Sequence, residues 1–302
     1  MILIGRWHRN SSQYLVKKGS IGRLFIISGD IMAIRLIAID MDGTLLTPDH
    51  QISPAVKAAI SRAQARGITV VLASGRPYIG IQQYVAELGL DKPGQFCISY
   101  NGALVQRAED GSCVAEVTLE HQDYLRFAQL ASTLGVHFQA LDKTHLYTPD
   151  KDISKYTVHE VSLTGIPLRY RSVEEMDPEL RFPKLMMVDE PEILDEAIAR
   201  LPAEILENYT VLKSSPFYLE ILNKQVNKGE AVRKLAELLG ISADEVMAIG
   251  DHENDLAMVT YAGSGVAMGN AIDIVKKHAR YQTLSNAEEG VALAIEKWAL
   301  CE

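Results

Sequence analysis

The sequence has few cysteines for its 302 residues. Cys97, Cys113 and Cys301 are the only three, and their separations match no metal-ligand pattern. An odd number of cysteines without such spacing indicates neither a zinc site nor a disulfide framework. Because reduced thiols are typical of the cytoplasm, we expect a cytoplasmic location.

Two further absences exclude classes of partner. No apolar run reaches the roughly 18–20 residues that a membrane span requires, so we expect no membrane partner. Lys and Arg number 30 against 39 Asp and Glu, a formal net charge of -9. Non-specific nucleic-acid binding depends on clustered Lys and Arg, so we expect no nucleic-acid partner. An anionic substrate stays compatible with this charge, because the local charge of a site decides what it binds.

The remaining composition, 47% apolar and 23% charged, is that of an ordinary globular protein. A chain of this length forms one large or two medium domains. Residues 1–31 are basic, with short apolar patches and no repeat, and Met32 directly precedes the first well-formed strand. We therefore expect Met32 to be the native start and residues 1–31 to be a disordered or non-native N-terminal extension.

The pattern after Met32 predicts an α/β fold. Residues 34–39 form a near-continuous apolar run, typical of a central parallel strand that is buried on both faces. Ser53, which precedes a proline, predicts the start of a helix. Two more apolar strands are expected at residues 68–73 and 96–100, with a helix between them. This β-α-β-α-β order predicts a Rossmann-like, doubly wound parallel sheet.

The middle of the chain has a different pattern. Strands and helices of mixed order are expected from residue 114 to residue 215, which indicates an inserted α+β module. The α/β pattern returns with a helix that Asn227 caps, so residues 33–113 and 216–302 are expected to form the α/β core.

Polar residues directly follow three of the expected strands. In open α/β sheets, ligands bind at the carboxyl ends of the strands, so we expect these residues to meet at one edge. They are Asp40 and Asp42 after the first strand, Ser74 and Gly75 after the second, and Asp251, Asn254 and Asp255 after residues 246–249.

Asp40 and Asp42 are two residues apart, so on a straight strand they would point to the same side. Two close carboxylates repel each other unless a cation lies between them, and hard cations such as magnesium prefer carboxylate oxygens. The alternative is a solvated turn, since Asp and Gly favour turns. The preference for magnesium over manganese rests on abundance and ligand hardness.

Lys228 lies at the expected start of a helix, where a cation is unfavourable unless an anion binds at the same point. The alternative is an ordinary solvated lysine. Together, these residues suit phosphoryl transfer, which requires positioning and charge neutralisation. A carboxylate nucleophile would form an acyl phosphate, and a second acid would protonate the leaving group and then activate water.

Four motifs in order resemble the haloacid dehalogenase superfamily: DMDGTLL (40–46), ASGRP (73–77), Lys228 and GDHEND (250–255). YNGA (100–103), LEI (219–221), VNKG (226–229) and VAMGNA (266–271) resemble its Cof-type subfamily. The resemblance covers nearly all of the chain except residues 1–31. It implies a phosphatase that acts on sugar phosphates and similar small monoesters with a Mg2+ cofactor. The catalytic core would be residues 33–113 and 216–302, and residues 114–215 would form a cap that closes over the site.

The resemblance also implies roles for single residues. Asp40 would be the nucleophile and a metal ligand. Asp42 would be the general acid and base, and its backbone carbonyl would be a second metal ligand. Asp251 and Asp255 would complete the metal site.

The transferring phosphoryl group would be bound by five residues, again as the resemblance implies. Ser74, the backbone N–H groups of Met41 and Gly75, Lys228 and Asn254 would hold it. The shape of the cap would set the substrate.

Two alternatives stay open. A phosphomutase uses the same phospho-aspartate but returns the phosphoryl group to a sugar. A phosphate-sensing receiver module would store phosphate on Asp40, although Asp42 and the inserted module argue against it. The oligomeric state is also open, with a homodimer as one option.

Overall fold

The computed structural model describes residues 16–18, 24–26 and 33–301, and it divides into two units, Met1–Ala33 and Ile34–Glu302. In the first unit, β1 (Val16–Lys18) pairs with β2 (Leu24–Ile26) in an antiparallel arrangement. The expectation for residues 1–31 otherwise falls outside the described residues and stays a prediction. Across the described ranges, no helix is both long and apolar enough to cross a membrane.

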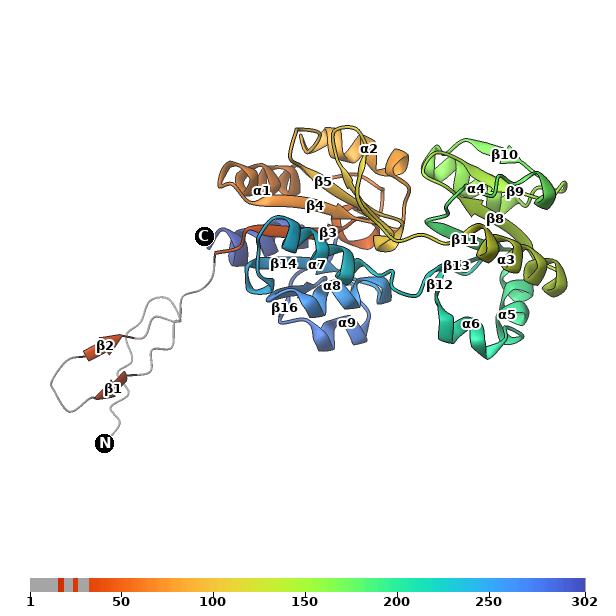
Figure 1. Cartoon of the computed structure of the whole chain (residues 1–302). Helices are drawn as coiled ribbons and strands as arrows, with labels where there is room; N and C mark the ends of the chain where they lie inside the picture. The colour runs from red at the N-terminus through yellow and green to blue at the C-terminus, as the bar shows by residue number, and fades with distance from the viewer. Residues whose placement is uncertain (1–15, 19–23, 27–32, 302) are drawn as a thin grey trace. The chain divides into compact units, whose positions relative to one another are not determined.

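The second unit contains an eight-stranded sheet (Figure 1). Its strands are β3 (Leu36–Asp40), β4 (Thr69–Ala73), β5 (Phe96–Ser99), β6 (Leu104–Arg107), β7 (Cys113–Glu116), β14 (Val246–Gly250), β15 (Ser264–Ala267) and β16 (Tyr281–Gln282). The spatial order is β16-β15-β14-β3-β4-β5-β6-β7, and the strands from β16 to β5 are parallel. The predicted doubly wound sheet is confirmed, with an antiparallel addition, β6 and β7, at one edge.

The sheet is built outward from β3, whose five residues are all buried. The chain passes from β3 to β4 and β5 in one direction, and from β14 to β15 and β16 in the other. Because parallel crossovers are right-handed, these two halves place their helices on opposite faces. The helices are α1 (Pro54–Ala65), α2 (Tyr78–Glu87), α7 (Lys228–Leu238), α8 (Leu256–Tyr261), α9 (Asp273–His278) and α10 (Gly290–Ala294).

The helix starts that the sequence predicted are confirmed. The Ser53 hydroxyl accepts a hydrogen bond from the N–H of Val56 at 3.2 Å, which caps α1. The Asn227 side chain accepts from the N–H of Glu230 at 2.8 Å and caps α7. Such caps satisfy backbone donors that have no partner within the helix.

A second sheet is formed by the chain between β7 and α7 (Figure 1). Its strands are β8 (His137–Leu141), β9 (Leu146–Thr148), β10 (Leu168–Tyr170), β11 (Lys184–Val188), β12 (Tyr209–Ser215) and β13 (Tyr218–Asn223). The helices of this segment are α3 (His121–Leu134), α4 (Lys155–Thr164), α5 (Pro191–Ala199) and α6 (Ala203–Asn208). The order is β10-β9-β8-β11-β13-β12, antiparallel except for the pair β9 and β10.

The boundaries between the parts of the chain that form the two sheets differ from the predicted domain boundaries. β13 lies in the second sheet between β11 and β12, although residues 216–302 were expected in the α/β core. β7 lies in the first sheet, although it extends past the predicted boundary at residue 114. A short apolar strand has the same pattern in either sheet, and only its pairing partners decide where it belongs.

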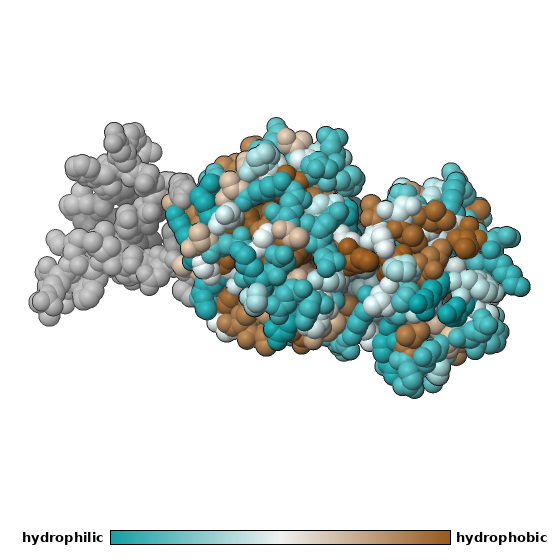
Figure 2. Space-filling model, turned by 90° about the horizontal axis from the view of Figure 1, so that it is seen from above, coloured by the Kyte–Doolittle hydropathy of each residue, from teal (hydrophilic) through white to brown (hydrophobic). Residues whose placement is uncertain are grey.

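Apolar side chains from both sheets meet in one buried cluster. Tyr100 and Leu104 from the end of β5 and from β6 pack in it with Leu141, Met186 and Leu222 of the second sheet. The Tyr100 hydroxyl also donates a 2.7 Å hydrogen bond to the carbonyl of Asp142. The face drawn in Figure 2 has hydrophilic and hydrophobic residues side by side. The buried cluster fixes the second sheet against the edge of the first, where the polar strand ends lie.

We predict that Gly229→Ala destabilises the protein. A Cβ at Gly229 would lie 2.5 Å from the carbonyl carbon of Ala257, so α7 and α8 would have to separate. In an open helix the same change stabilises by about 1 kcal/mol, whereas overpacking of this kind costs roughly 1–3 kcal/mol. Urea unfolding followed by circular dichroism measures the change, with the exposed Glu237→Ala on the same helix as the control. A Gly229→Ala protein as stable as wild type would contradict the prediction.

Candidate active site

The carboxyl ends of β14, β3 and β4 lie side by side, because these strands are neighbours and parallel. A cavity of about 340 Å³ opens over this edge, between the first sheet and the second. Six of the residues selected from the sequence line it: Asp40, Asp42, Ser74, Gly75, Asp251 and Asn254.

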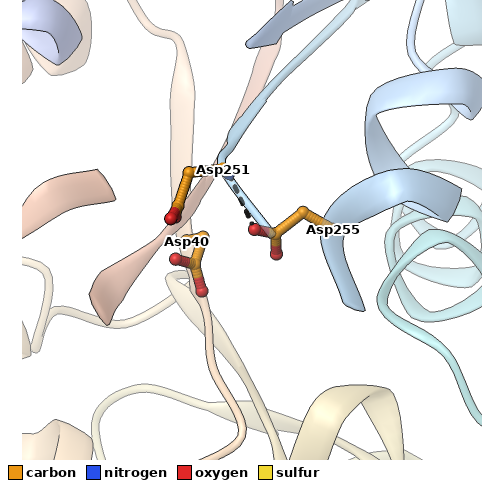
Figure 3. A group of neighbouring side chains, drawn as sticks. All are labelled: Asp40, Asp251 and Asp255. Carbon is orange, nitrogen blue, oxygen red and sulfur yellow. Dashed lines mark hydrogen bonds between the residues drawn. The ribbon is translucent and has the colours of Figure 1, made fainter. Parts of the chain in front are cut away.

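Three carboxylates converge beside the cavity, and two of them, Asp40 and Asp251, line it. Asp40 ends β3, Asp251 follows β14, and Asp255 precedes α8. One oxygen from each lies within 4.8 Å of the others, and the side chains face one another in Figure 3. Asp40 is 6% exposed and Asp255 is fully buried, so little water screens their charges. Hard divalent cations prefer such an all-oxygen donor set.

Local hydrogen bonds hold two of these carboxylates in place. Asp255 Oδ2 accepts from the backbone N–H groups of Asp251 at 2.9 Å and His252 at 3.1 Å, and the first of these bonds is drawn in Figure 3. The Thr44 hydroxyl donates to Asp251 Oδ1 at 2.7 Å. The backbone at Gly250 approaches closely, since a Cβ there would lie 2.4 Å from that of Asp255.

Lys228 lies behind the carboxylates and is fully buried. Its ammonium group contacts Asp40 Oδ1 and donates to Asp255 Oδ1 at 2.7 Å. Its place at the start of a helix predicted an anion beside it, and the two carboxylates meet that expectation. Lys228 is not a solvated surface lysine.

The cluster carries an excess of negative charge. Burial raises the pKa of the Asp40 carboxyl well above its ordinary value, and the charges of Asp255 and Asp251 raise it further against the opposing effect of Lys228. Burial alone would lower the pKa of Lys228, but Asp255 and Asp40 outweigh it, so that pKa is raised. One ammonium group cannot neutralise three carboxylates, and the donor set therefore fits a divalent cation.

Asp42 does not join the three carboxylates. It accepts hydrogen bonds from Arg76 Nε at 2.9 Å and Nη2 at 2.6 Å. The expectation that Asp40 and Asp42 point to one side was made for a straight strand, and the backbone is not straight here. β3 ends at Asp40, and the backbone turns through Asp42 and Gly43, which has a φ of 84°.

The residues expected to bind a phosphoryl group lie at two depths. Ser74, Gly75 and Asn254 line the cavity, whereas Lys228 lies beneath Asp40 and does not line it. The side chain of Met41 is fully buried in the core, which leaves only its backbone beside Asp40.

Several residues of the site were not predicted from the sequence. Four of them lie within the motifs quoted above, but no role was assigned to them: Thr44, Arg76, Asn101 and Glu220. Glu160 and Lys184 had no signal beyond a charge beside apolar neighbours. All but Thr44 line the cavity; Lys184 and Glu220 enter it from the second sheet, and Glu160 enters it from α4.

The geometry agrees with the comparison to known proteins. Residues 37–295 match the family of haloacid dehalogenase-like hydrolases, and the chain belongs to this family. The resemblance that the motifs indicated is thereby confirmed, and the chain is a hydrolase by family.

Similar proteins are known from several bacteria. A Bacillus subtilis protein named "Putative phosphatase YxeH" is 45% identical over 268 residues, which cover 89% of this chain and 99% of that protein. The 5-amino-6-(5-phospho-D-ribitylamino)uracil phosphatase YcsE of Bacillus subtilis is 34% identical over 268 residues, 88% of this chain and 96% of that protein. The crystal structure of a haloacid dehalogenase-like hydrolase from Bacteroides thetaiotaomicron has a TM-score of 0.79 and 33% identity, covering 87% of this chain and 99% of that one.

We predict that Mg2+ raises the thermal stability of the protein through the three carboxylates. A ligand that binds only the folded state stabilises it by about 2.7 kcal/mol at 100 times its Kd. Differential scanning calorimetry in chelator and then in increasing Mg2+ should show a rising Tm for wild type. Asp251→Asn should lose most of the rise, and Asp195→Asn, an exposed carboxylate in α5, should keep it. An equal rise in the two variants would place the effect elsewhere.

A second prediction concerns pH in the presence of chelator. The folded protein holds the Asp40 proton more tightly than the unfolded chain, because the pKa of this carboxyl is raised. Wild type should therefore lose stability as pH rises from the ordinary carboxyl pKa through the raised folded value. The amide of the Asp40→Asn variant cannot titrate, so the stability advantage of this variant should grow over the window and then level off. Urea unfolding between about pH 4 and pH 8 tests this, and a pH-independent difference would contradict it.

Proposed function

We propose that this chain is a magnesium-dependent phosphatase that hydrolyses sugar phosphates and related small phosphate monoesters through a phospho-aspartate on Asp40. The observation that carries the proposal is the setting of Asp40, which faces the cavity while Lys228 holds it from behind. The phosphatase names of two relatives, YxeH and YcsE, support the same reaction.

The proposed chemistry has two steps. A carboxylate oxygen of Asp40 attacks phosphorus, the bond from phosphorus to the leaving oxygen breaks, and Asp42 gives that oxygen a proton. Water then attacks the phosphorus of the phospho-aspartate and loses a proton to Asp42, which frees phosphate and restores the Asp40 carboxylate. For this, the Asp42 carboxylate has to turn from Arg76 toward the leaving group.

The charges of the site also suit the binding of a phosphoryl group. We propose that Asp40, Asp251, Asp255 and the Asp42 backbone carbonyl hold Mg2+. When bound, the ion would neutralise negative charge on the nucleophile and the phosphate. The phosphoryl oxygens would be taken by the Ser74 hydroxyl, the N–H groups of Met41 and Gly75, Lys228 and Asn254. The motifs support this assignment, and so does the position of Ser74, Gly75 and Asn254 in the lining of the cavity.

The substrate class is proposed from the second sheet, which acts as a cap. Its side chains toward the cavity are mainly polar, and they include Lys213, Ser214 and Tyr218 besides the charged residues already named. Polar groups of this kind can hydrogen-bond the hydroxyls of a sugar or sugar alcohol. A cavity of about 340 Å³ suits a small molecule. We further propose a cytoplasmic location.

We predict that phosphate release from a panel of sugar monophosphates requires Mg2+ and stops in excess chelator. Asp40→Asn should lower kcat by roughly 1,000-fold or more with the fold intact, since it removes the nucleophile. Glu204→Gln, which changes an exposed carboxylate in α6 that pairs with Arg126 outside the cavity, serves as the control. Malachite-green detection of phosphate, with chromatography of the sugar products, measures both outcomes.

Three results would contradict the proposal. Isomeric sugar phosphate with little free phosphate would identify a phosphomutase. A long-lived phospho-aspartate without turnover would favour a phosphate sensor. An Asp40→Asn protein with wild-type kinetics would remove Asp40 from the role of nucleophile.

A further inference from the structure

Two hydrogen bonds join the second sheet directly to the site. Glu220 on β13 accepts from Asn101 Nδ2 at 2.9 Å, and Lys184 on β11 donates to the carbonyl of Gly75 at 3.4 Å. Lys184 and Glu220 are themselves an ion pair at 3.1 Å. The ion pair of Lys184 and Glu220 in the second sheet therefore contacts both the loop after β4 and the turn after β5.

These contacts are shielded from water. Asn101 is 3% exposed, Glu220 is 5% exposed and Lys184 is 2% exposed. Glu220 Oε1 also accepts from the Ser214 hydroxyl at 2.9 Å, so both of its oxygens are hydrogen-bonded. Glu160 lies 3.5 Å from Lys184 on its other side. In such a dry, fully connected network, each group can adopt few arrangements.

Asn101 also forms a hydrogen bond with Asn254. Its Oδ1 accepts from Asn254 Nδ2 at 3.0 Å, and its backbone N–H donates to the carbonyl of Ser74 at 2.9 Å. The residue has a φ of 56°, a left-handed conformation that places its side chain between Glu220 and Asn254.

The order of donors and acceptors follows from the chemistry of Glu220. An ionised carboxylate only accepts hydrogen bonds, so Asn101 has to present its NH2 group to Glu220 and its oxygen to Asn254. Asn254 in turn has to present its own NH2 group. The second N–H of that group is then oriented as well, and it is the donor expected to meet a phosphoryl oxygen.

We propose that Glu220 is a positioning residue for phosphoryl transfer, acting through Asn101 to fix the amide orientation of Asn254. Lys184 balances the charge of Glu220 and holds the Gly75 carbonyl, so the adjoining phosphate loop is placed by the same pair. The inference rests on the proposed function, because it needs a phosphoryl group in the cavity. It makes the second sheet a part of the catalytic site in addition to its role as a cover.

The test is a double-mutant cycle on the full chain with p-nitrophenyl phosphate and Mg2+. Asn101→Gly keeps the left-handed backbone and removes both amide hydrogen bonds, and Asn254→Ala removes the proposed donor. Each should lower kcat by about 100–1,000-fold with KM changed by less than about 3-fold, in the range for one lost donor to a transition state. The double variant should be no slower than the slower single variant, because both changes remove one function.

A third variant tests Glu220 while keeping a second acceptor beside the buried Lys184, which Glu220→Ala would leave with Glu160 alone. Glu220→Gln keeps an acceptor for Lys184 but can present either end of its amide to Asn101. We expect a drop in kcat of about 3–10-fold, absent when Asn254 is already Ala. Glu204→Gln, an exposed carboxylate in α6 that pairs with Arg126, should match wild type.

The outcomes separate the two proposals. No phosphate release by wild type would overturn the proposed function and this inference with it. Normal wild-type release with multiplicative effects of Asn101→Gly and Asn254→Ala would overturn the inference alone. Variants that lower Tm and raise KM at unchanged kcat would also overturn it, since they would show a purely structural role.

Discussion

The buried contact of Lys228 with Asp40 and Asp255 is the interaction on which the rest of the site depends. A charge removed from water is tolerated only when opposite charges and hydrogen bonds compensate it. Here one ammonium group compensates two carboxylates, Asp40 at the end of β3 and Asp255 just before α8, and a third, Asp251, lies close by. The remaining negative charge suits the binding of a divalent cation. Without a cation, burial and the charges of Asp255 and Asp251 keep the pKa of Asp40 raised.

The fold supplies this contact through close backbone packing. α7 brings Lys228 to the sheet edge only because Gly229 lets it approach α8 so closely. Gly102 allows a similar approach on the other side, since a Cβ there would lie 2.4 Å from the carbonyl oxygen of Asn227. Both glycines flank the helix start, so the position of the ammonium group is set by main-chain contacts, which are stiffer than side-chain contacts.

The second sheet contributes side chains to the lining of the cavity as well as covering it. The short segment after β5 has two functions at once: Tyr100 packs in the apolar cluster between the sheets, while Asn101 enters the site. Neighbouring residues of the turn therefore couple the seating of the second sheet to the polar groups around Asp40. Lys184 and Glu220 extend the coupling from the other side, and their burial makes it sensitive to small displacements.

Local patterns in the sequence determined the strands of the α/β core, the caps at Ser53 and Asn227, and the carboxylates at the strand ends. Each of these is decided by residues close together in the chain, through burial period, cap chemistry or the end of an apolar run. Tertiary structure alone decided that β13 joins the second sheet, that Asp42 turns to Arg76, and that Glu160 and Lys184 enter the cavity. Strand pairing and ion pairing join residues that are far apart in the sequence. The residues next to a charged side chain in the sequence therefore do not predict which partner it will pair with.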